Sequence, residues 1–329
     1  MSFWNELSRP FFCLAPMEDV TDTVFREIVL SVSDKNYLNV VFGEFTSTDG
    51  LCHPLGRAKV AHRLFINDSE RNLLQEKNVK IVAQIWGSEP ENFYKSAKII
   101  ESEYNFDGID INMGCPVKKI VKQASCSELI KFPDLAREII IATKEGTKLP
   151  VSVKTRTGIK EHITEKWIAN LLEAKPAAIT LHARTQKMMS DFPAEWEQVA
   201  IAVEVRNSID KNIPIIGNGD LFSLEECLSK IDAYKVDGVM VGRGIFKNPY
   251  FFNLNSSNHS KIELLELMKK HLNLFVNTWG NEKNLQIMKK FFKIYTFGFY
   301  GAADLRAKLM ECHTYEEIIN IIDNEISHS

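Results

Sequence analysis

The chain has 329 residues, of which 45% are hydrophobic and 25% are charged, and its formal net charge is −3. This composition can form a large buried core, which excludes a disordered chain, and the charge excludes a protein that binds nucleic acid through overall positive charge. No two cysteines are closely spaced, so neither a zinc site nor a disulfide framework is expected among Cys13, Cys52, Cys115, Cys126, Cys227 and Cys312.

The N-terminal segment is not expected to act as a targeting signal. Residues 1–10 include Glu6 and Arg9 and lack a basic region followed by an apolar one, and no apolar run in the chain approaches membrane-spanning length. We therefore expect a soluble, cytoplasmic protein with reduced cysteines.

Short apolar runs alternate with segments of helical pattern. Successive runs begin between 25 and 42 residues apart, which leaves room for one crossover helix each and predicts a parallel sheet. Eight such units in about 250 residues predict a (β/α)8 TIM barrel. An open doubly wound sheet is the alternative, but no Gly-x-Gly-x-x-Gly follows the first run. The runs are residues 11–16, 40–44, 79–86, 108–113, 150–156, 178–184, 213–220 and 238–244.

Helices are predicted between these runs. Apolar residues recur at three-to-four spacing in residues 91–104, 134–144 and 224–231. Ser125 and Glu128 have the spacing of an N-terminal capping box, which predicts a helix start there.

The alternation of strand and helix ends after Pro249. Residues 253–260 are polar enough for a linker, and apolar residues recur at helical spacing from Lys261 onward. The sequence therefore predicts an α/β catalytic barrel in residues 1–252, followed by a small all-helical C-terminal domain in residues 257–329.

Basic and aromatic side chains are interleaved in residues 283–308, where the only acid is Asp304. The simpler interpretation is a helix pair with a solvated basic face and an aromatic core face, and the alternative is a surface for an RNA backbone. The residues are Lys283, Lys289, Lys290, Lys293, Arg306 and Lys308, with Phe291, Phe292, Tyr295, Phe297, Phe299 and Tyr300.

Polar or small residues end most of the predicted strands, and the carboxyl ends of the strands carry the functional site of a TIM barrel. The last two strands end in glycine-containing turns, where barrels commonly bind phosphate because bare N–H groups can approach an anion closely. The residues at the strand ends are Ala15, Pro16, Met17, Gln84, Asn112, Cys115, Lys154, Arg156, His182, Arg184, Gly217, Asn218, Gly219, Asp220, Gly242, Arg243 and Gly244.

Each of these residues also has a structural interpretation. Gln84 or His182 alone is more often a hydrogen-bonded core residue than a ligand contact, and Cys115 alone is more often structural than catalytic. Lys154 is different, because an unpaired buried cation costs several kcal/mol and requires an anionic partner. The convergence of all of them on one rim favours a functional site.

Six segments occur in the order found in tRNA-dihydrouridine synthases, and the chain resembles a bacterial member of that family. The resemblance covers residues 11–250 and, more loosely, the helix around residues 288–295. The segments are Ala15-Pro16-Met17 with Val20-Thr21-Asp22, Asp110-Ile111-Asn112-Met113-Gly114-Cys115-Pro116, Val153-Lys154-Thr155-Arg156-Thr157-Gly158, Leu181-His182-Ala183-Arg184-Thr185, Gly217-Asn218-Gly219-Asp220 and Val241-Gly242-Arg243-Gly244.

The resemblance implies an enzyme that reduces the 5,6 double bond of specific uridines in tRNA to dihydrouridine. It implies FMN as cofactor, NADPH or NADH as reductant, hydride transfer to C6 of uracil, and proton transfer from Cys115 to C5. A thiol with an ordinary pKa of about 8.5 is protonated at neutral pH, so we expect Cys115 not to be strongly activated. A monomer without a metal ion is expected.

The resemblance also assigns roles to the residues at the strand ends. Cofactor binding is implied for Pro16, Met17, Gln84, Lys154, His182, Asn218, Gly219, Asp220, Gly242 and Arg243. Substrate binding is implied for Asn112, Lys154 and Arg184. Contacts with the RNA backbone are implied for Lys118, Lys119, Lys122 and the segment from Lys289 to Arg306.

Two segments depart from the family pattern. Residues 123–129 replace a glycine-rich segment and bring Cys126 close in sequence to Cys115, and Asp19 stands where glycine is common. We expect Cys126 to be inert.

Three other functions are compatible with parts of the sequence. A flavin barrel acting on a free pyrimidine would not require the basic-aromatic tail. An RNA-binding protein without catalysis would not require Cys115, Asn112 and Lys154 together. An aldolase or isomerase with Lys154 as Schiff base would leave Asn112 to Pro116 unexplained.

Overall fold

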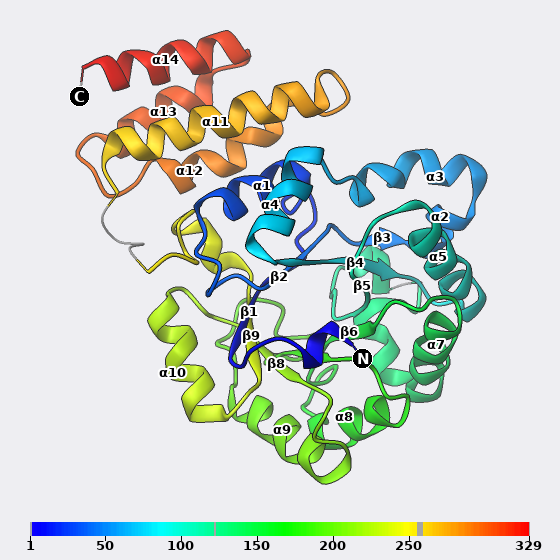
Figure 1. The fold of residues 1–329 in the computed structure, drawn as a ribbon. Coiled ribbons are helices and arrows are strands. Elements are labelled where there is room, and N and C mark those ends of the chain that lie inside the picture. The colour runs from blue at the N-terminus through cyan, green and yellow to red at the C-terminus, as the bar shows by residue number, and fades with distance from the viewer. Residues whose placement is uncertain (1, 122, 255–258, 329) are drawn as a thin grey trace.

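A closed parallel barrel surrounded by helices forms most of the molecule (Figure 1). The computed structural model describes residues 2–121, 123–254 and 259–328. Within these residues the sheet order is β2-β1-β9-β8-β7-β6-β5-β4-β3, every strand pair is parallel, and a β2–β4 pairing closes the cylinder. The predicted TIM barrel is therefore confirmed.

Each of the eight predicted apolar runs contains one barrel strand. The short additional strand β3 pairs with the end of β4, with Thr46 beside Ile85, and was not predicted. The strands are β1 (Phe11–Leu14), β2 (Val40–Phe42), β3 (Thr46–Ser47), β4 (Lys80–Trp86), β5 (Gly108–Met113), β6 (Val151–Arg156), β7 (Ile179–His182), β8 (Ile215–Asn218) and β9 (Gly238–Val241).

Helices cover the outside of the barrel, and the predicted helices correspond to α5, α7 and α10. The α-helices of this part are α1 (Thr23–Val32), α2 (Thr48–Cys52), α3 (Pro54–Val60), α4 (Asp68–Lys77), α5 (Pro90–Glu103), α6 (Lys118–Val121), α7 (Pro133–Glu145), α8 (Thr164–Glu173), α9 (Glu197–Ile209) and α10 (Leu224–Tyr234). Short 3-10 helices are η1 (Phe3–Asn5), η2 (Ala61–Leu64), η3 (Cys126–Lys131) and η4 (Arg243–Phe246).

The predicted capping box at Ser125 is wrong. Ser125 precedes the 3-10 helix η3, but its side chain makes no capping hydrogen bond and its hydroxyl instead donates to the carbonyl of Gln123 at 3.1 Å. The backbone on either side of Ser125 explains the missing cap. Ala124 and Cys126 are left-handed, so the chain does not enter η3 as the first turn of an α-helix.

The amino-terminal half of the barrel interior is filled by apolar side chains. Phe11 and Cys13 of β1 alternate with residues of the outer core, as the two-residue period of a strand requires. Trp4 of η1 is fully buried and packs on Phe11 and Phe42 with ring centroids 5.8 and 6.4 Å apart. This plug fills the amino end of the barrel, and the hollow end is at the carboxyl ends of the strands.

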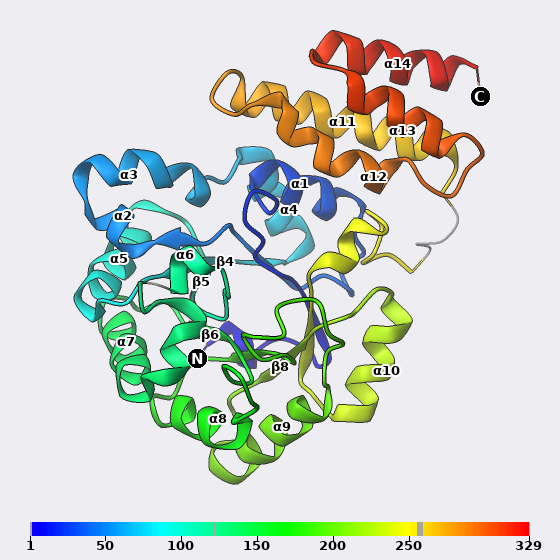
Figure 2. The ribbon, with the colours of Figure 1, turned by 180° about the vertical axis from the view of Figure 1, so that it is seen from behind.

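A helical bundle follows the barrel and packs on α1, as two opposite views show (Figures 1 and 2). The predicted linker includes residues 255–258, which lie outside the described part of the chain. The bundle consists of α11 (Lys261–Trp279), η5 (Leu285–Phe291), α12 (Phe292–Tyr295), α13 (Ala302–Glu311) and α14 (Tyr315–Ser327). An N-terminal capping box at Ser260 and Glu263 begins α11.

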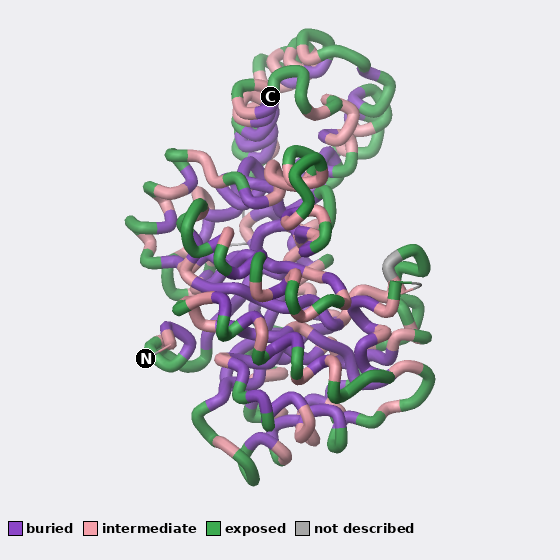
Figure 3. The backbone as a smooth tube through the Cα atoms, turned by 90° about the vertical axis from the view of Figure 1, so that its right-hand side faces the viewer, coloured by how far each residue is buried: buried purple, intermediate pink, exposed green. Residues whose placement is uncertain are grey.

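The bundle and the barrel share one apolar core, and buried stretches of backbone occur in both of them and where they meet (Figure 3). Phe291 stacks on Phe25 of α1 with ring centroids 5.0 Å apart. Asp22 caps α1 and also accepts hydrogen bonds from Trp279 Nε1 and Lys283 Nζ, both at 2.9 Å. Removal of residues 257–329 would therefore expose Phe25 and unpair Asp22, so such a truncation does not test RNA binding cleanly.

The aromatic residues of segment 283–308 serve the core in part. Phe291, Phe292 and Tyr295 are buried, in agreement with the simpler interpretation of this segment, whereas Tyr300 is fully exposed.

No helix among the described residues is long and apolar enough to cross a membrane.

Acidification is expected to loosen the packing of the bundle on the barrel. Burial lowers the pKa of His271 to about 4, and this neutral imidazole hydrogen-bonds the Tyr295 hydroxyl at 2.8 Å. In the unfolded chain histidine has a pKa of about 6.5, so only the unfolded state takes up the proton between pH 6.5 and 4, and stability falls as pH falls through that range. We expect about 2 kcal/mol to be lost between pH 6.5 and 5.

Urea unfolding of the wild type and of His271→Gln at pH 7 and pH 5 checks this expectation. Glutamine can still hydrogen-bond Tyr295 but does not titrate, so the variant should lose less stability on acidification than the wild type. Equal losses in the two proteins would assign the pH dependence to other groups.

Candidate active site

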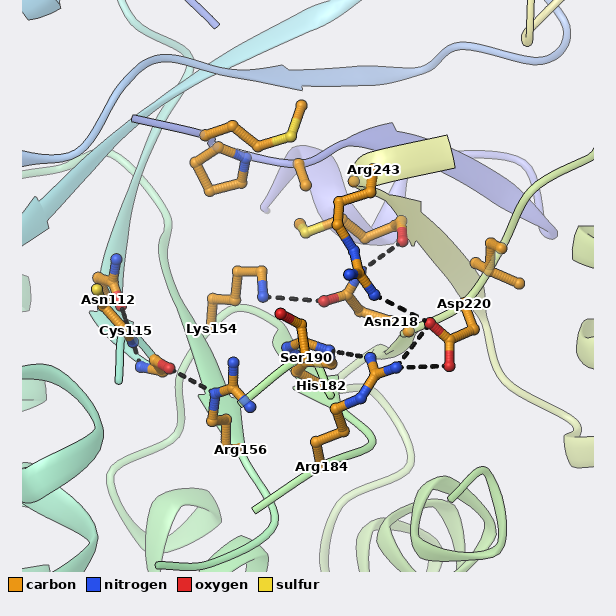
Figure 4. A pocket seen from close by; sticks show the side chains of 18 of the residues that line it. Asn112, Cys115, Lys154, Arg156, His182, Arg184, Ser190, Asn218, Asp220 and Arg243 are labelled. Carbon is orange, nitrogen blue, oxygen red and sulfur yellow. Dashed lines mark hydrogen bonds and ion pairs between the residues drawn. The ribbon is translucent and has the colours of Figure 1, made fainter. Parts of the chain in front are cut away.

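All thirteen site residues that the sequence predicted line one cavity at the carboxyl ends of the strands. The empty space there is about 930 Å³, including the part open to solvent. Figure 4 shows Cys115 and Asn112 at one end, Arg184, Asp220 and Arg243 at the other, and Lys154 between them. The thirteen are Pro16, Met17, Gln84, Asn112, Cys115, Lys154, His182, Arg184, Asn218, Gly219, Asp220, Gly242 and Arg243.

Several lining residues received no role from the sequence. Phe45 follows β2 and Met240 lies within β9, so their positions at strand ends could have indicated them. Ser190 lies in the long loop between β7 and α9, where no local pattern points to the cavity. The lining residues without a predicted role are Ala15, Phe45, Gly114, Pro116, Arg156, Ser190, Leu221, Phe222, Met240 and Gly244.

A directional chain of hydrogen bonds crosses the base of the cavity. The N–H groups of Gly114 and Cys115 donate to Asn112 Oδ1, both at 3.0 Å, and Asn112 Nδ2 donates to Gln84 Oε1 at 2.9 Å. Gln84 Nε2 then donates to Asp110 Oδ2 at 2.7 Å. Because an ionised carboxylate only accepts hydrogen bonds, Asp110 fixes the orientation of both amides and thereby the backbone of the Cys115 loop.

Asp110 is fully buried, and burial raises its pKa to about 6, while hydrogen bonds from Ser152 and Gln84 oppose the rise. The carboxyl is therefore largely ionised at neutral pH. It faces the same interior as Asn112 because the two residues are two apart on β5. The sequence placed Asp110 in a motif but gave it no role.

Lys154 is a half-buried cation at the centre of the cavity. Its Nζ donates to Asn218 Oδ1 at 3.0 Å, and no carboxylate in the described part of the chain lies within ion-pair distance. Burial, reinforced by the charge of Arg156, lowers its pKa to about 8, whereas Asp110 raises it. The protonated amine is thus available to an anionic or hydrogen-bond-accepting ligand.

Cys115 is a half-buried thiol at the rim, and the expectation that it keeps an ordinary pKa is wrong. A hydrogen bond from the Cys126 thiol, with smaller contributions from the Val117 N–H and the Arg156 charge, lowers the pKa of Cys115 to about 7 against the effect of burial. The sequence could not indicate this, because the two cysteines meet only through the path of the intervening loop.

Most N–H donors of Arg184 are taken up by protein atoms at the other end of the cavity. It lies 2% exposed, donates to both Asp220 oxygens at 2.7 and 2.6 Å, to the Phe192 carbonyl at 2.6 Å and to His182 Nε2 at 2.9 Å. Burial and the surrounding cations lower the pKa of His182 well below its usual value, so the imidazole is neutral and accepts this bond.

Asp220 holds a second, more exposed cation at the mouth. Arg243 lies 3.3 Å from Asp220 Oδ1, and its side chain is 55% exposed. Nearby Gly242 would place a Cβ within 4 Å of only one atom, Ala15 Cβ, so its bare backbone borders open space. Gly219 has φ +132° and its Cβ would lie 2.7 Å from Ala194, so a larger residue does not fit there.

Comparisons with known proteins match nearly the whole chain. The family described as "Dihydrouridine synthase (Dus)" matches residues 13–329. The chain belongs to the dihydrouridine synthase family. It is therefore an enzyme, as the sequence predicted.

Relatives within this family share about two fifths of their residues with the chain. A "Probable tRNA-dihydrouridine synthase" of Staphylococcus aureus (strain COL) is 42% identical over 324 residues, covering 98% of this chain and 95% of its own. A "Probable tRNA-dihydrouridine synthase 2" of Bacillus subtilis (strain 168) is 40% identical over 326 residues, covering 98% and 96%.

Solved structures share the fold of this chain at low sequence identity. Morphinone reductase superimposes with a TM-score of 0.53 and 11% identity, over 78% of this chain and 89% of its own. A morphinone reductase in complex with tetrahydroNAD gives 0.52 and 11% over 78% and 91%. These similarities concern the barrel architecture.

The two departures from the family pattern are left-handed positions of the backbone. Asp19 has φ 53°, and Ala124 and Cys126 have φ 53° and 55°, which are conformations that glycine adopts most easily. Non-glycine residues thus occupy turns of this chain that suit glycine.

No group of three or more histidine, cysteine, aspartate or glutamate side chains suited to a metal ion occurs among the described residues. All six cysteines are free thiols.

Proposed function

We propose that this protein reduces the 5,6 double bond of specific uridines in tRNA to dihydrouridine, with the C5 proton supplied by Cys115. Bound FMN would supply the hydride for C6 and would be re-reduced by NADPH or NADH. A tRNA-modifying enzyme acts where tRNA is, so we place this activity in the cytoplasm.

The observation that carries the proposal is one cavity with a thiol at one end, a half-buried lysine without a carboxylate partner among the described residues at its centre, and two arginines at the other end. A flavin mononucleotide has a planar ring with hydrogen-bonding edges and a distant phosphate. Lys154 and Gln84 suit the polar ring edge, because both offer N–H donors in the cavity.

The opposite end of the cavity suits a phosphate. Arg243 is a partly exposed cation, and Gly242 lets an anion approach the bare backbone. Asn218 and Gly219 would complete this end, and His182 would face the connecting chain as a neutral imidazole. Pro16 and Met17 follow β1 at the rim and would pack on the ring.

Asp220 and Arg184 have a different role in this proposal. The carboxylate of Asp220 would repel a phosphate directly, but it holds Arg184 and Arg243 in place through ion pairs with both guanidinium groups. We therefore propose that Asp220 positions the cations and that Arg184, whose donors are largely taken up by protein atoms, acts as a brace for the site.

Cys115 would act as the acid after hydride addition. Its S–H lies at the rim, and Asn112 fixes the backbone N–H of Cys115 from below, which leaves the second Nδ2–H of Asn112 for the edge of the uracil. Because the cavity is recessed within the barrel, the target base must leave its stack to enter it.

The tRNA backbone would be held by lysines around the mouth and on the bundle. Lys118 and Lys119 of α6 are exposed, whereas Lys122 lies outside the described residues. On the bundle, Lys290 binds the Asp19 carbonyl at 2.8 Å and Lys283 binds Asp22, so these two serve the domain contact. Lys293 and Lys308 are exposed.

The purified protein and unmodified tRNA transcripts test the proposed function. We expect flavin absorbance in the preparation and formation of dihydrouridine in tRNA when NADPH is added, measured by mass spectrometry of nucleosides. A protein that binds FMN and reduces free uracil or orotate but not tRNA would instead favour the small-pyrimidine alternative.

Replacement of Lys293 and Lys308 by glutamine is expected to weaken tRNA binding and leave flavin content unchanged. Each lost phosphate contact lowers the slope of log affinity against log salt by about one. Lys211→Gln is the matched control, because Lys211 precedes β8 and lies at the amino end of the barrel. Binding titrations between roughly 50 and 200 mM salt, the range in which such contacts respond, measure this slope. If the double variant kept the wild-type slope, Lys293 and Lys308 would not contact the RNA backbone.

A further inference from the structure

The amide oxygen of Asn112 has no acceptor position left for a ligand. It accepts the N–H groups of Gly114 and Cys115, both at 3.0 Å, which occupy both of its lone pairs. A backbone N–H can only donate, so reversal of this amide would set its NH2 group against two donors. Because Asn112 lines the cavity, it offers the cavity only a hydrogen-bond donor.

Asp110 fixes the far end of the same chain of hydrogen bonds. Its Oδ2 accepts Gln84 Nε2 at 2.7 Å, and its Oδ1 accepts the Ser152 hydroxyl at 2.6 Å. The carboxyl is fully buried and is not among the residues that line the cavity. It therefore acts on a ligand only through other side chains.

Gln84 joins the two ends, and its orientation follows from both. Its Oε1 accepts Asn112 Nδ2 at 2.9 Å, while its Nε2 donates to Asp110. In the reversed orientation its oxygen would face the carboxylate and its NH2 group would face that of Asn112. Buried polar groups without a partner are costly, so the chain has one stable direction. One N–H of Asn112 Nδ2 remains for the cavity.

We propose that Asp110, through Gln84, keeps Asn112 a hydrogen-bond donor to the cavity, and that this polarity makes the site accept uracil and reject cytosine. This inference rests on the proposed function, in which Asn112 binds the pyrimidine. The two bases differ at C4, which carries an oxygen that accepts in uracil and an amino group that donates in cytosine. Asp110 is a positioning residue in this arrangement, because it lines no part of the cavity.

The group on C4 is the one that Asn112 would meet. Cys115 would give its proton to C5, and the ring neighbours of C5 are C4 and C6, of which only C4 carries a hydrogen-bonding group. Asn112 Oδ1 accepts the backbone N–H of Cys115, and Figure 4 shows the two residues together at one end of the cavity. The oxygen of uracil would pair with the remaining N–H, whereas the amino group of cytosine would leave two donors facing each other.

A second donor in the cavity, Lys154 Nζ, belongs to a separate set of contacts. It donates to Asn218 Oδ1 at 3.0 Å, and Asn218 Nδ2 donates to the Met240 carbonyl at 2.7 Å. Substitutions at positions 110 and 112 leave these hydrogen bonds in place, so the contributions of the two donors can be separated.

Exchange of Asp110 and Asn112 reverses the chain while conserving its size and charge. In Asn112→Asp alone, the new carboxylate keeps the bonds from Gly114 and Cys115 but sets its second oxygen against Gln84 Oε1. Gln84 cannot turn, because Asp110 also only accepts. Addition of Asp110→Asn supplies an N–H at that end, so Gln84 can turn and every group is paired again. Position 112 then offers the cavity an acceptor.

Urea unfolding and tRNA binding measure the two parts of the proposal. The urea midpoint of the exchanged variant, Asp110→Asn with Asn112→Asp, should lie above that of Asn112→Asp, although it carries one more substitution. Mass spectrometry locates the uridine that the wild type reduces, and transcripts with uridine or cytidine at that position are then compared. The wild type should bind the uridine transcript about tenfold more tightly, and the exchanged variant should lose or reverse this preference.

The same exchange at Asp49 and Asn92 is the control. Asn92 Nδ2 donates to Asp49 Oδ1 at 2.8 Å at an exposed contact between α2 and α5, and neither residue lines the cavity. This exchange should leave the preference for uridine unchanged.

Two results would overturn the proposal. An exchanged variant no more stable than Asn112→Asp would overturn the chain of hydrogen bonds, and an exchanged variant that keeps the wild-type preference for uridine would overturn its role in base selection. A wild type that reduces no tRNA uridine would instead overturn the proposed function, and the urea comparison, which needs neither flavin nor tRNA, would still test the chain.

Discussion

Cys115→Ala is expected to lower the rate of tRNA uridine reduction by about 10²–10⁴-fold, the usual contribution of a general acid. Cys115 lies at the rim of the cavity, and its side chain takes no part in the hydrogen bonds that join Asp110, Gln84 and Asn112. Loss of the thiol therefore leaves those hydrogen bonds in place. Flavin content and reduction of the flavin by NADPH should therefore remain near the wild-type values, as stopped-flow absorbance would measure.

The pH dependence of the wild type gives a second measurement of the same group. Because the pKa of Cys115 is lowered to about 7, the protonated form that can act as acid declines above that pH. The rate of the reduction step should fall about tenfold per pH unit above this value. The alanine variant should lose this dependence.

Cys115→Ser is the matched variant for this experiment. A serine hydroxyl retains the size and a proton but is a far weaker acid than a thiol, so it should be nearly as slow as alanine. Turnover at the wild-type rate in either variant would assign the proton to another group.

Arg26→Met is expected to destabilise the protein by about 3–5 kcal/mol, the usual effect of unpairing a buried charge. Arg26 and Glu70 are both fully buried and bind through two contacts, Nε to Oε1 at 2.6 Å and the second nitrogen to Oε2 at 2.9 Å. Without the guanidinium, Glu70 stays in an apolar surrounding that already raises its pKa.

The pair also bears on the candidate active site. Arg26 donates to the Thr21 carbonyl at 2.6 Å, and the Thr21 hydroxyl accepts the N–H of Met17 at 2.9 Å. Arg26 thus supports the loop that carries Met17 at the rim. We expect weaker flavin retention in the variant at temperatures below its unfolding midpoint.

Chemical denaturation of Arg26→Met, Glu70→Leu and the double variant measures this coupling. The double variant leaves no buried charge unpaired, so it should be more stable than either single variant. Additive losses in the double variant would contradict a buried pair and indicate that each side chain acts by packing alone.

Local sequence was sufficient to locate the barrel strands and the rim of the cavity. Short apolar runs at regular spacing specify parallel strands, and parallel strands place their carboxyl ends at one edge, so Lys154 and His182 were predicted to meet without any structure. The same reasoning missed η1, because a helix of only three residues is too short to show a periodic pattern. Only packing shows that Trp4 plugs the barrel.

Within the site, the sequence determined which functional groups converge, and the tertiary structure decided what each of them contacts. The orientation of Gln84 depends on Asp110, 26 residues away, and the pKa of Cys115 depends on the path of a loop that returns Cys126 to it. Periodicity is a property of neighbouring residues and reports which face of a strand is buried. Hydrogen bonds and buried charges depend on ångström-scale separations between distant segments, which only the folded chain fixes.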